Sequence, residues 1–178
     1  MFDEVADFAK TQNHYVIRIN TWDGPKDLEE KTLKQLHQLI NEAARKFREN
    51  GCEEIKILGK SFGGQLTLTH PENQEFAKMI LWAPALDTRK EGNIAKWRQT
   101  KLKEAEKPED IKISTQKLRE TTTPTKIIHG NQDQVISIEN SRKLQKHIPE
   151  CELEEIPETG HSYQEKEPLV VRETKNYL

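Results

Sequence analysis

The chain is organised around ten consecutive residues, Ile55-Lys56-Ile57-Leu58-Gly59-Lys60-Ser61-Phe62-Gly63-Gly64. The first four form a β-branched and apolar run that predicts a short strand. Residues 59–63 then have the spacing Gly-x-Ser-x-Gly, and a helix is expected to follow. In this context the serine lies on a tight strand-to-helix turn, with its hydroxyl exposed above the sheet edge. Small residues are needed beside it because the turn is strained and the two elements pack closely.

A phosphate-binding loop is the competing interpretation of Gly59-Lys60-Ser61. Such a loop has the pattern Gly-x-x-x-x-Gly-Lys-Ser/Thr, which requires a glycine at position 54. That position is occupied by Glu54, whose Cβ and negative charge both oppose phosphate binding. We therefore set the nucleotide-binding interpretation aside.

The composition indicates a polar protein with one domain, residues 1–178. Charged and hydrophobic residues each make up 33% of the chain, the net charge is −2, and the mean hydropathy is −0.90. This length suffices for one hydrophobic core, and the interspersed charges argue against a nucleic-acid surface. No apolar run approaches the ~18 residues of a membrane span.

The first residues and the cysteines indicate a cytoplasmic protein. Met1-Phe2-Asp3-Glu4 lacks the basic and apolar regions of a signal peptide. Cys52 and Cys151 lack the spacing of metal ligands, and we expect them to be reduced. No metal or organic cofactor is expected.

Helical and extended patterns alternate along the chain. Asp27 is predicted to cap a long helix, with Glu30 completing a capping box, and Asn50-Gly51 to close it. Its apolar residues, spaced by three and four, run from Leu33 to Phe47. Other helices are predicted at 2–11, 66–68, 138–147 and 169–177, and strands at 15–19, 55–58, 78–83, 125–128 and 151–156. This alternation predicts an α/β fold, with a mostly parallel sheet of about five strands and helices on both faces.

Residues 86–122 differ from the rest because isolated apolar residues lie among many charges. The segment exceeds the usual length of a connection. It is either an ordinary crossover or a small lid. In the second case Trp97 would contact the substrate.

Three polar residues follow three separate strands: Ser61, Asp133 and His161. In parallel sheets, functional groups gather at the carboxyl ends of the strands. A serine hydroxyl is a weak nucleophile that needs a base, and histidine can take its proton. A carboxylate holds the imidazole in the correct tautomer. The three residue types together predict nucleophilic catalysis.

Other interpretations exist at each position. Ser61 could be a turn serine, and Asp133 could be an N-cap or turn residue. Asp87 and Asp110 are alternative acids, but both lie in the 86–122 segment. His129 lies at a strand end and could be a core residue or could support the site. The other histidines lie before a strand, on helices or at a helix end: His14, His37, His70 and His147.

The chain resembles the α/β-hydrolase superfamily. Gly59–Gly64 resembles its nucleophile elbow, and His129-Gly130-Asn131-Gln132-Asp133 resembles its acid loop. Gly160-His161-Ser162 resembles the loop that carries its histidine, and Trp82-Ala83-Pro84 resembles the end of the strand after the elbow helix. The resemblance implies that Ser61 is the nucleophile, His161 the general base and Asp133 the acid. It also implies that Phe62 donates its backbone N–H to the oxyanion hole.

The chain departs from this family at its start. Family members have a further strand between those corresponding to 15–19 and 55–58, and the loop after it supplies a second oxyanion donor. We do not expect an open gap, because buried backbone groups without partners cost about 1–3 kcal/mol each. Either the two strands pair directly, or residues ahead of Met1 supply the missing strand and donor.

The resemblance therefore predicts a serine hydrolase that cleaves a small carboxylic ester through an acyl-enzyme on Ser61. A non-catalytic binding protein with the same fold is the alternative. Thioesterase or peptidase activity on the same residues is a third interpretation.

Overall fold

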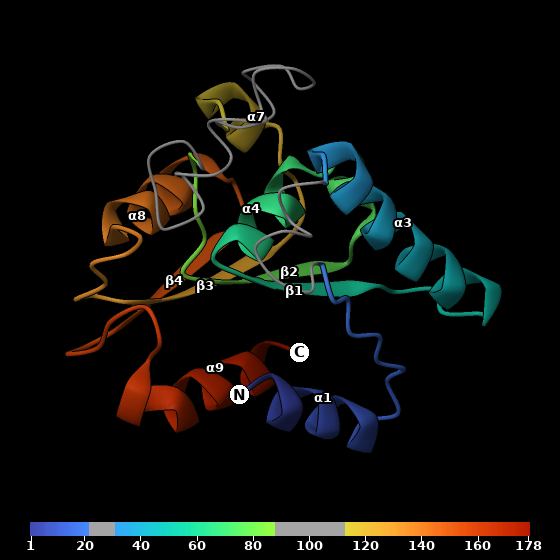
Figure 1. Cartoon of the computed structure of the whole chain (residues 1–178), viewed down its shortest axis with the longest axis horizontal. Coiled ribbons are helices and arrows are strands. Elements are labelled where there is room, and N and C mark those ends of the chain that lie inside the picture. The colour runs from blue at the N-terminus through green and yellow to red at the C-terminus, as the bar shows by residue number, and fades with distance from the viewer. Residues whose placement is uncertain (22–30, 88–112) are drawn as a thin grey trace.

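The computed structural model describes residues 1–21, 31–87 and 113–178 (Figure 1). Its centre is a four-stranded sheet in the order β1-β2-β3-β4, with every neighbouring pair parallel. The strands are β1 (Lys56–Lys60), β2 (Lys78–Trp82), β3 (Thr125–Gly130) and β4 (Cys151–Ile156). The predicted α/β fold with a parallel sheet is confirmed.

Helices cover both faces of the sheet (Figure 1). One face carries α1 (Phe2–Thr11) and α9 (Glu167–Tyr177), and the other carries α3 (Leu33–Glu49), α4 (Phe62–Thr69), α7 (Thr115–Arg119) and α8 (Ile138–His147). Two short 3₁₀ turns, Asn73–Glu75 and Gln164–Lys166, complete the described elements. In the described part of the chain, no helix is long and apolar enough to cross a membrane.

Alternating side chains of β2 connect the two layers of the core. Ile80 and Trp82 pack toward α1 and α9, whereas Met79 and Leu81 pack toward α4, α7 and α8. All four are fully buried. A strand buried on both faces reads as a continuous apolar run, which explains the sequence Met-Ile-Leu-Trp.

The prediction of a strand at 15–19 is wrong. This segment has no regular secondary structure and is not part of the sheet. No backbone hydrogen bond joins it to β1 among the described residues. Its β-branched side chains favour an extended backbone, but a strand also needs a partner edge within hydrogen-bonding distance.

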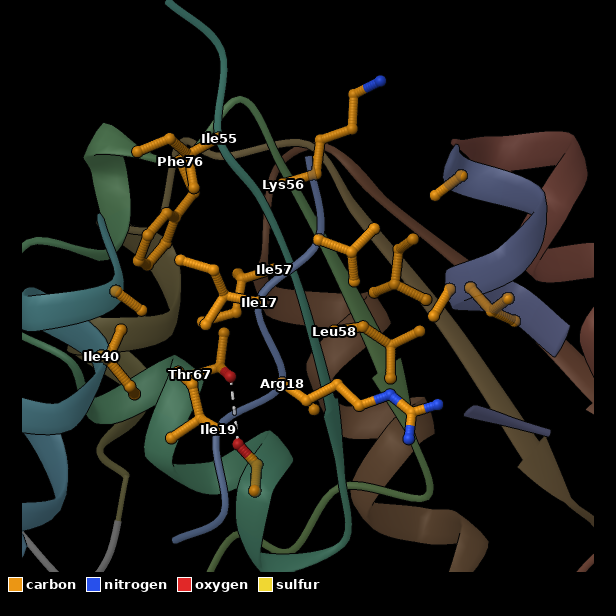
Figure 2. A pocket seen from close by; sticks show the side chains of 18 of the residues that line it. Ile17, Arg18, Ile19, Ile40, Ile55, Lys56, Ile57, Leu58, Thr67 and Phe76 are labelled. Carbon is orange, nitrogen blue, oxygen red and sulfur yellow. Dashed lines mark hydrogen bonds between the residues drawn. The ribbon is translucent and has the colours of Figure 1, made fainter. Parts of the chain in front are cut away.

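Direct pairing of residues 15–19 with β1, one of the two outcomes expected for the gap, is also wrong for the described residues. A groove lies between residues 14–21 and β1 (Figure 2). The cost of about 1–3 kcal/mol for an unpaired backbone group applies only where that group is buried. This groove is open to solvent, since Tyr15 and Ile17 on its wall are 71% and 38% exposed. Water can therefore hydrate the unpaired groups there.

The long helix α3 begins at Leu33 and is capped by Thr32, not by Asp27. The Thr32 side chain accepts a hydrogen bond from the Gln35 backbone N–H, and the Gln35 side chain accepts one from the Thr32 N–H. This reciprocal pair is a capping box. Asp27 and Glu30 lie outside the described residues.

Most of the 86–122 segment, including Trp97 and Asp110, lies outside the described residues. Its described ends belong to the core. Leu86, Ile113 and Leu118 are buried in one cluster with Leu81 of β2.

Candidate active site

Ser61 lies on a strained turn between β1 and α4. It has φ 55° and ψ −118°, a conformation that residues with a Cβ rarely adopt. Its N–H donates to Trp82 O at 2.8 Å, and its carbonyl oxygen accepts from Ala85 N at 3.1 Å. The surrounding backbone therefore holds the strained residue against the end of β2.

Two glycines beside Ser61 are required by close packing. A Cβ on Gly59 would lie 2.6 Å from the Gly63 carbonyl oxygen, and one on Gly64 would lie 2.9 Å from Pro84 Cβ. A Cβ on Gly63 would meet nothing within 4 Å. The close packing of α4 against β1 and Pro84 thus depends on Gly59 and Gly64. Gly64 lies one residue beyond the Gly-x-Ser-x-Gly motif.

Asp133 and His161 form a hydrogen-bonded pair. His161 Nδ1 lies 2.7 Å from Asp133 Oδ2. The Asp133 side chain is fully buried, and that of His161 is 19% exposed. One ring nitrogen of His161 thus contacts the acid, which leaves Nε2 for another partner.

The two loops that carry this pair are bonded to each other. Gln132 N donates to Thr159 O at 3.0 Å, and Glu158 N donates to Asn131 Oδ1 at 2.9 Å. A Cβ on Gly130 would lie 2.4 Å from Thr159 O, so a glycine is needed where β3 meets the histidine loop. This packing sets the distance between Asp133 and His161.

Asp133 is held as a carboxylate. Burial alone would raise its pKa, but hydrogen bonds from His129 and His161 outweigh that effect and hold the pKa well below its usual value. The backbone N–H groups of Val135 and Ile136 contribute by donating to Oδ1 at 2.8 and 2.9 Å. The loop after β3 is therefore built around a negative charge.

A second histidine, His129, contacts the same carboxylate oxygen. Its Nε2 lies 3.1 Å from Asp133 Oδ2 and 3.1 Å from Ile136 O. Both of those atoms are acceptors, so Nε2 must carry the hydrogen. Nδ1 lies 2.6 Å from Ser141 Oγ on α8, and the whole residue is buried. The sequence left open whether His129 is a core residue or supports the site; its contacts support the latter.

The Ser61 turn meets the segment after His161 through one side-chain contact. Lys60 Nζ lies over the ring of Tyr163, 5.1 Å from its centroid. Desolvation lowers the pKa of Lys60, while Glu167 and Asp133 act in the opposite direction. Tyr163 is fully buried and donates its hydroxyl to Ile128 O at 2.7 Å. Sequence reasoning missed Tyr163, which no motif marks.

Ser61 and His161 are not hydrogen-bonded to each other among the described residues. In enzymes without a bound substrate such contacts are often loose. Phe62 is the first residue of α4, where backbone N–H groups point away from the helix. The described residues contain no cluster of side chains that could hold a metal ion.

No protein-family model and no curated protein matches the chain. Several solved structures do. Est1E from Butyrivibrio proteoclasticus, with bound ferulic acid, matches with a TM-score of 0.77 and 18% identity, over 98% of this chain and 80% of that one. The structure of the metagenome-derived lipolytic enzymes LipS and LipT matches with a TM-score of 0.74 and 16% identity, over 99% and 86%.

A third match is MGS-MChE2, an α/β hydrolase from the metagenome of lagoon sediments at Mar Chica, Morocco. Its TM-score is 0.64 and its identity 18%, over 90% of this chain and 74% of that one. The chain therefore has the α/β-hydrolase fold.

Proposed function

We propose that this protein is a serine hydrolase that cleaves a carboxylic ester, with Ser61, His161 and Asp133 as its catalytic residues. The observation that carries the proposal is the 2.7 Å hydrogen bond between His161 Nδ1 and buried Asp133, in a protein whose Ser61 sits on a strained turn. The names of the structural neighbours, which include esterases and lipolytic enzymes, support ester substrates.

The proposed reaction has two steps. His161 Nε2 takes the Ser61 proton as Oγ attacks the acyl carbonyl, and the imidazolium then protonates the leaving alcohol. Water next gives a proton to His161 and attacks the acyl-enzyme, and Ser61 regains its proton as the acid departs. Asp133 stabilises the imidazolium in both steps. The Phe62 N–H, at the start of α4, is the proposed donor to the oxyanion.

Labelling with a fluorophosphonate probe tests the nucleophile. The probe should attach to Ser61, as located by mass spectrometry, and Ser61→Ala should abolish both labelling and hydrolysis of p-nitrophenyl acetate. Because the alanine would occupy the same turn, the melting temperature should change little. Ser162→Ala, next to His161 and exposed, is the matched control and should keep its activity. Full activity in the Ser61→Ala variant would exclude Ser61 as the nucleophile.

A non-catalytic binding protein is the second candidate. Two observations favour this candidate. Ser61 and His161 form no hydrogen bond with each other among the described residues, and no second oxyanion donor is assigned. One lost oxyanion donor costs roughly 10²–10³-fold in rate. A burst of p-nitrophenol equal to the enzyme concentration would support the hydrolase, whereas no burst and no labelling would support the binding protein. Thioester and peptide substrates remain alternatives for the same residues.

A further inference from the structure

Lys60 lies between the two parts of the candidate site. It comes directly before Ser61 in the Gly-x-Ser-x-Gly motif, and its Nζ lies over the ring of Tyr163, two residues after His161. The Lys60 side chain is partly buried, and among the residues that the structure describes it forms no hydrogen bond or ion pair. The face of the Tyr163 ring is therefore the main protein group that contacts its charge.

Tyr163 is held by side chains from three neighbouring strands. Its hydroxyl donates to Ile128 O of β3 at 2.7 Å, and its ring meets that of Trp82 of β2 edge-on, with 6.5 Å between the centroids. Lys60, the last residue of β1, makes the third contact. The three contacting residues are register partners in adjacent strands. Of these contacts, the one from Lys60 comes from the residue beside Ser61.

The position of Tyr163 determines how His161 is held. Tyr163 N donates to Gly160 O at 3.1 Å, which closes a four-residue turn with His161 as its second residue. Tyr163 has a φ of 60°, a conformation that a residue with a Cβ keeps only where its surroundings impose it. A displaced Tyr163 would therefore change the direction of the His161 side chain relative to Ser61.

We propose that Lys60 is a positioning residue, whose ammonium group on the ring of Tyr163 fixes the turn that carries His161 relative to Ser61. An apolar side chain could fill the space beside the ring, but it would lack the attraction between a cation and the ring face. The effect on turnover rests on the proposed function. The effect on the orientation of His161 does not, and it can be measured without turnover.

The groups around Lys60 determine when this contact exists. Partial burial lowers the pKa of Lys60, while Glu167 at the start of α9 and Asp133 after β3 act in the opposite direction. Burial raises the pKa of the Tyr163 hydroxyl well above its usual value, so the ring stays neutral while Lys60 titrates. The contact is present while Lys60 is charged, and it is lost below the pH of roughly 10.4 at which an ordinary lysine loses its proton.

Two substitutions separate the charge of Lys60 from its packing. Lys60→Met keeps most of the apolar stem and loses the charge, whereas Lys60→Arg keeps a cation that stacks on aromatic rings. We expect kcat for p-nitrophenyl acetate to fall about three- to tenfold in Lys60→Met, with KM little changed, and to recover in Lys60→Arg. Lys78→Met is the matched control, because it removes a lysine 4.8 Å from the centroid of the Tyr177 ring, at the other end of the sheet. It should leave kcat unchanged.

The pH profile of kcat is a readout that packing alone would not move. In the unaltered chain, kcat should fall on the alkaline side toward the value of Lys60→Met, as Lys60 loses its proton. Lys60→Arg should show no such fall, because its guanidinium group stays charged. The profile of Lys60→Met should be level over the same range.

The hydrogen on His161 Nδ1, which donates to Asp133 Oδ2, gives a readout without turnover. Its exchange with water, measured by NMR, should be about threefold or more faster in Lys60→Met and should return to the original rate in Lys60→Arg. If the unaltered chain shows this pattern but neither hydrolysis nor fluorophosphonate labelling, the proposed function fails and the positioning of His161 by Lys60 stands.

Two results would overturn the proposal. An unchanged His161 exchange rate in Lys60→Met, or an unchanged kcat in a chain that hydrolyses the ester, would show that Tyr163 is held without the cation. A loss of activity in Lys60→Arg as severe as that in Ser61→Ala would show that Lys60 must give up its proton during the reaction, as a base for Ser61.

Discussion

At the scale of single residues, the site is organised around one oxygen atom. Asp133 Oδ2 accepts hydrogen bonds from two histidines, while Oδ1 accepts two backbone N–H groups. A buried carboxylate with four donors is charged and fixed in position. Under the proposed function, Asp133 can then select one tautomer and one orientation of the His161 ring.

Asp133→Asn tests the acid. The amide keeps the shape but lets its NH₂ group face Nδ1, which selects the wrong tautomer of His161. We expect ester turnover to fall by on the order of 10⁴-fold while the fold is kept. If instead Asp110→Asn were damaging and Asp133→Asn silent, the acid would lie in the 86–122 segment.

The lowered pKa of Asp133 predicts how stability depends on pH. Because the pKa in the folded state lies below the unfolded value of roughly 3.9, the charged group stabilises the fold above that pH, and this stability is lost as pH falls. The free energy difference between the native chain and Asp133→Asn should be constant above about pH 5 and shrink below about pH 4. Urea unfolding at a series of pH values measures it. A difference that grows on acidification would contradict the assignment.

His129 is predicted to be a positioning residue. In His129→Gln, loss of the Nε2 hydrogen bond removes one of the interactions that lower the Asp133 pKa, so the loss of stability on acidification should be smaller and should be complete at a higher pH. Turnover should fall about tenfold, with KM little changed. Ser141→Ala removes only the partner of Nδ1 and should have the smaller effect on both measurements. An unchanged pH profile in His129→Gln would leave His129 as a core residue only.

At the scale of elements, the connection between β1 and α4 depends on two close approaches. The Gly59 site faces the Gly63 backbone, and the Gly64 site faces Pro84. Backbone atoms and a proline ring cannot move aside as a flexible side chain can. The end of the strand and the first turn of the helix therefore need residues without a Cβ at positions 59 and 64.

Substitution by alanine should distinguish the glycines of this turn. Gly64→Ala brings a Cβ to 2.9 Å from Pro84 Cβ and should lower the free energy of unfolding by about 1–3 kcal/mol. Gly63→Ala has open space and should stabilise α4 by up to about 1 kcal/mol. Chemical denaturation of the two variants provides the comparison. Equal losses in both would contradict the packing described for this turn.

At the scale of the whole molecule, the sheet ends at β1 although an apolar groove continues beyond it. The ring of Phe2 lies 4.7 Å from that of Trp82, between centroids, which places the start of α1 beside the carboxyl end of β2.

The sequence by itself determined the alternation of helices and strands, and it predicted the three motif residues Ser61, Asp133 and His161. These depend on local patterns: β-branched runs, helical spacing, and small residues at tight turns. The helix at 138–147 and the strand at 151–156 have the predicted bounds because their patterns are complete within a few residues. The start of α3 was mistaken because Asp27 and Thr32 both suit an N-cap.

Only the tertiary structure decided which edges pair and which side chains meet. Residues 15–19 have a strand-like sequence but no backbone partner among the residues that the structure describes, because a groove separates them from β1. His129 and Ser141 meet because α8 packs on β3, and no local pattern encodes that contact. Pairing and packing join residues far apart in the chain, so their outcome depends on the whole fold.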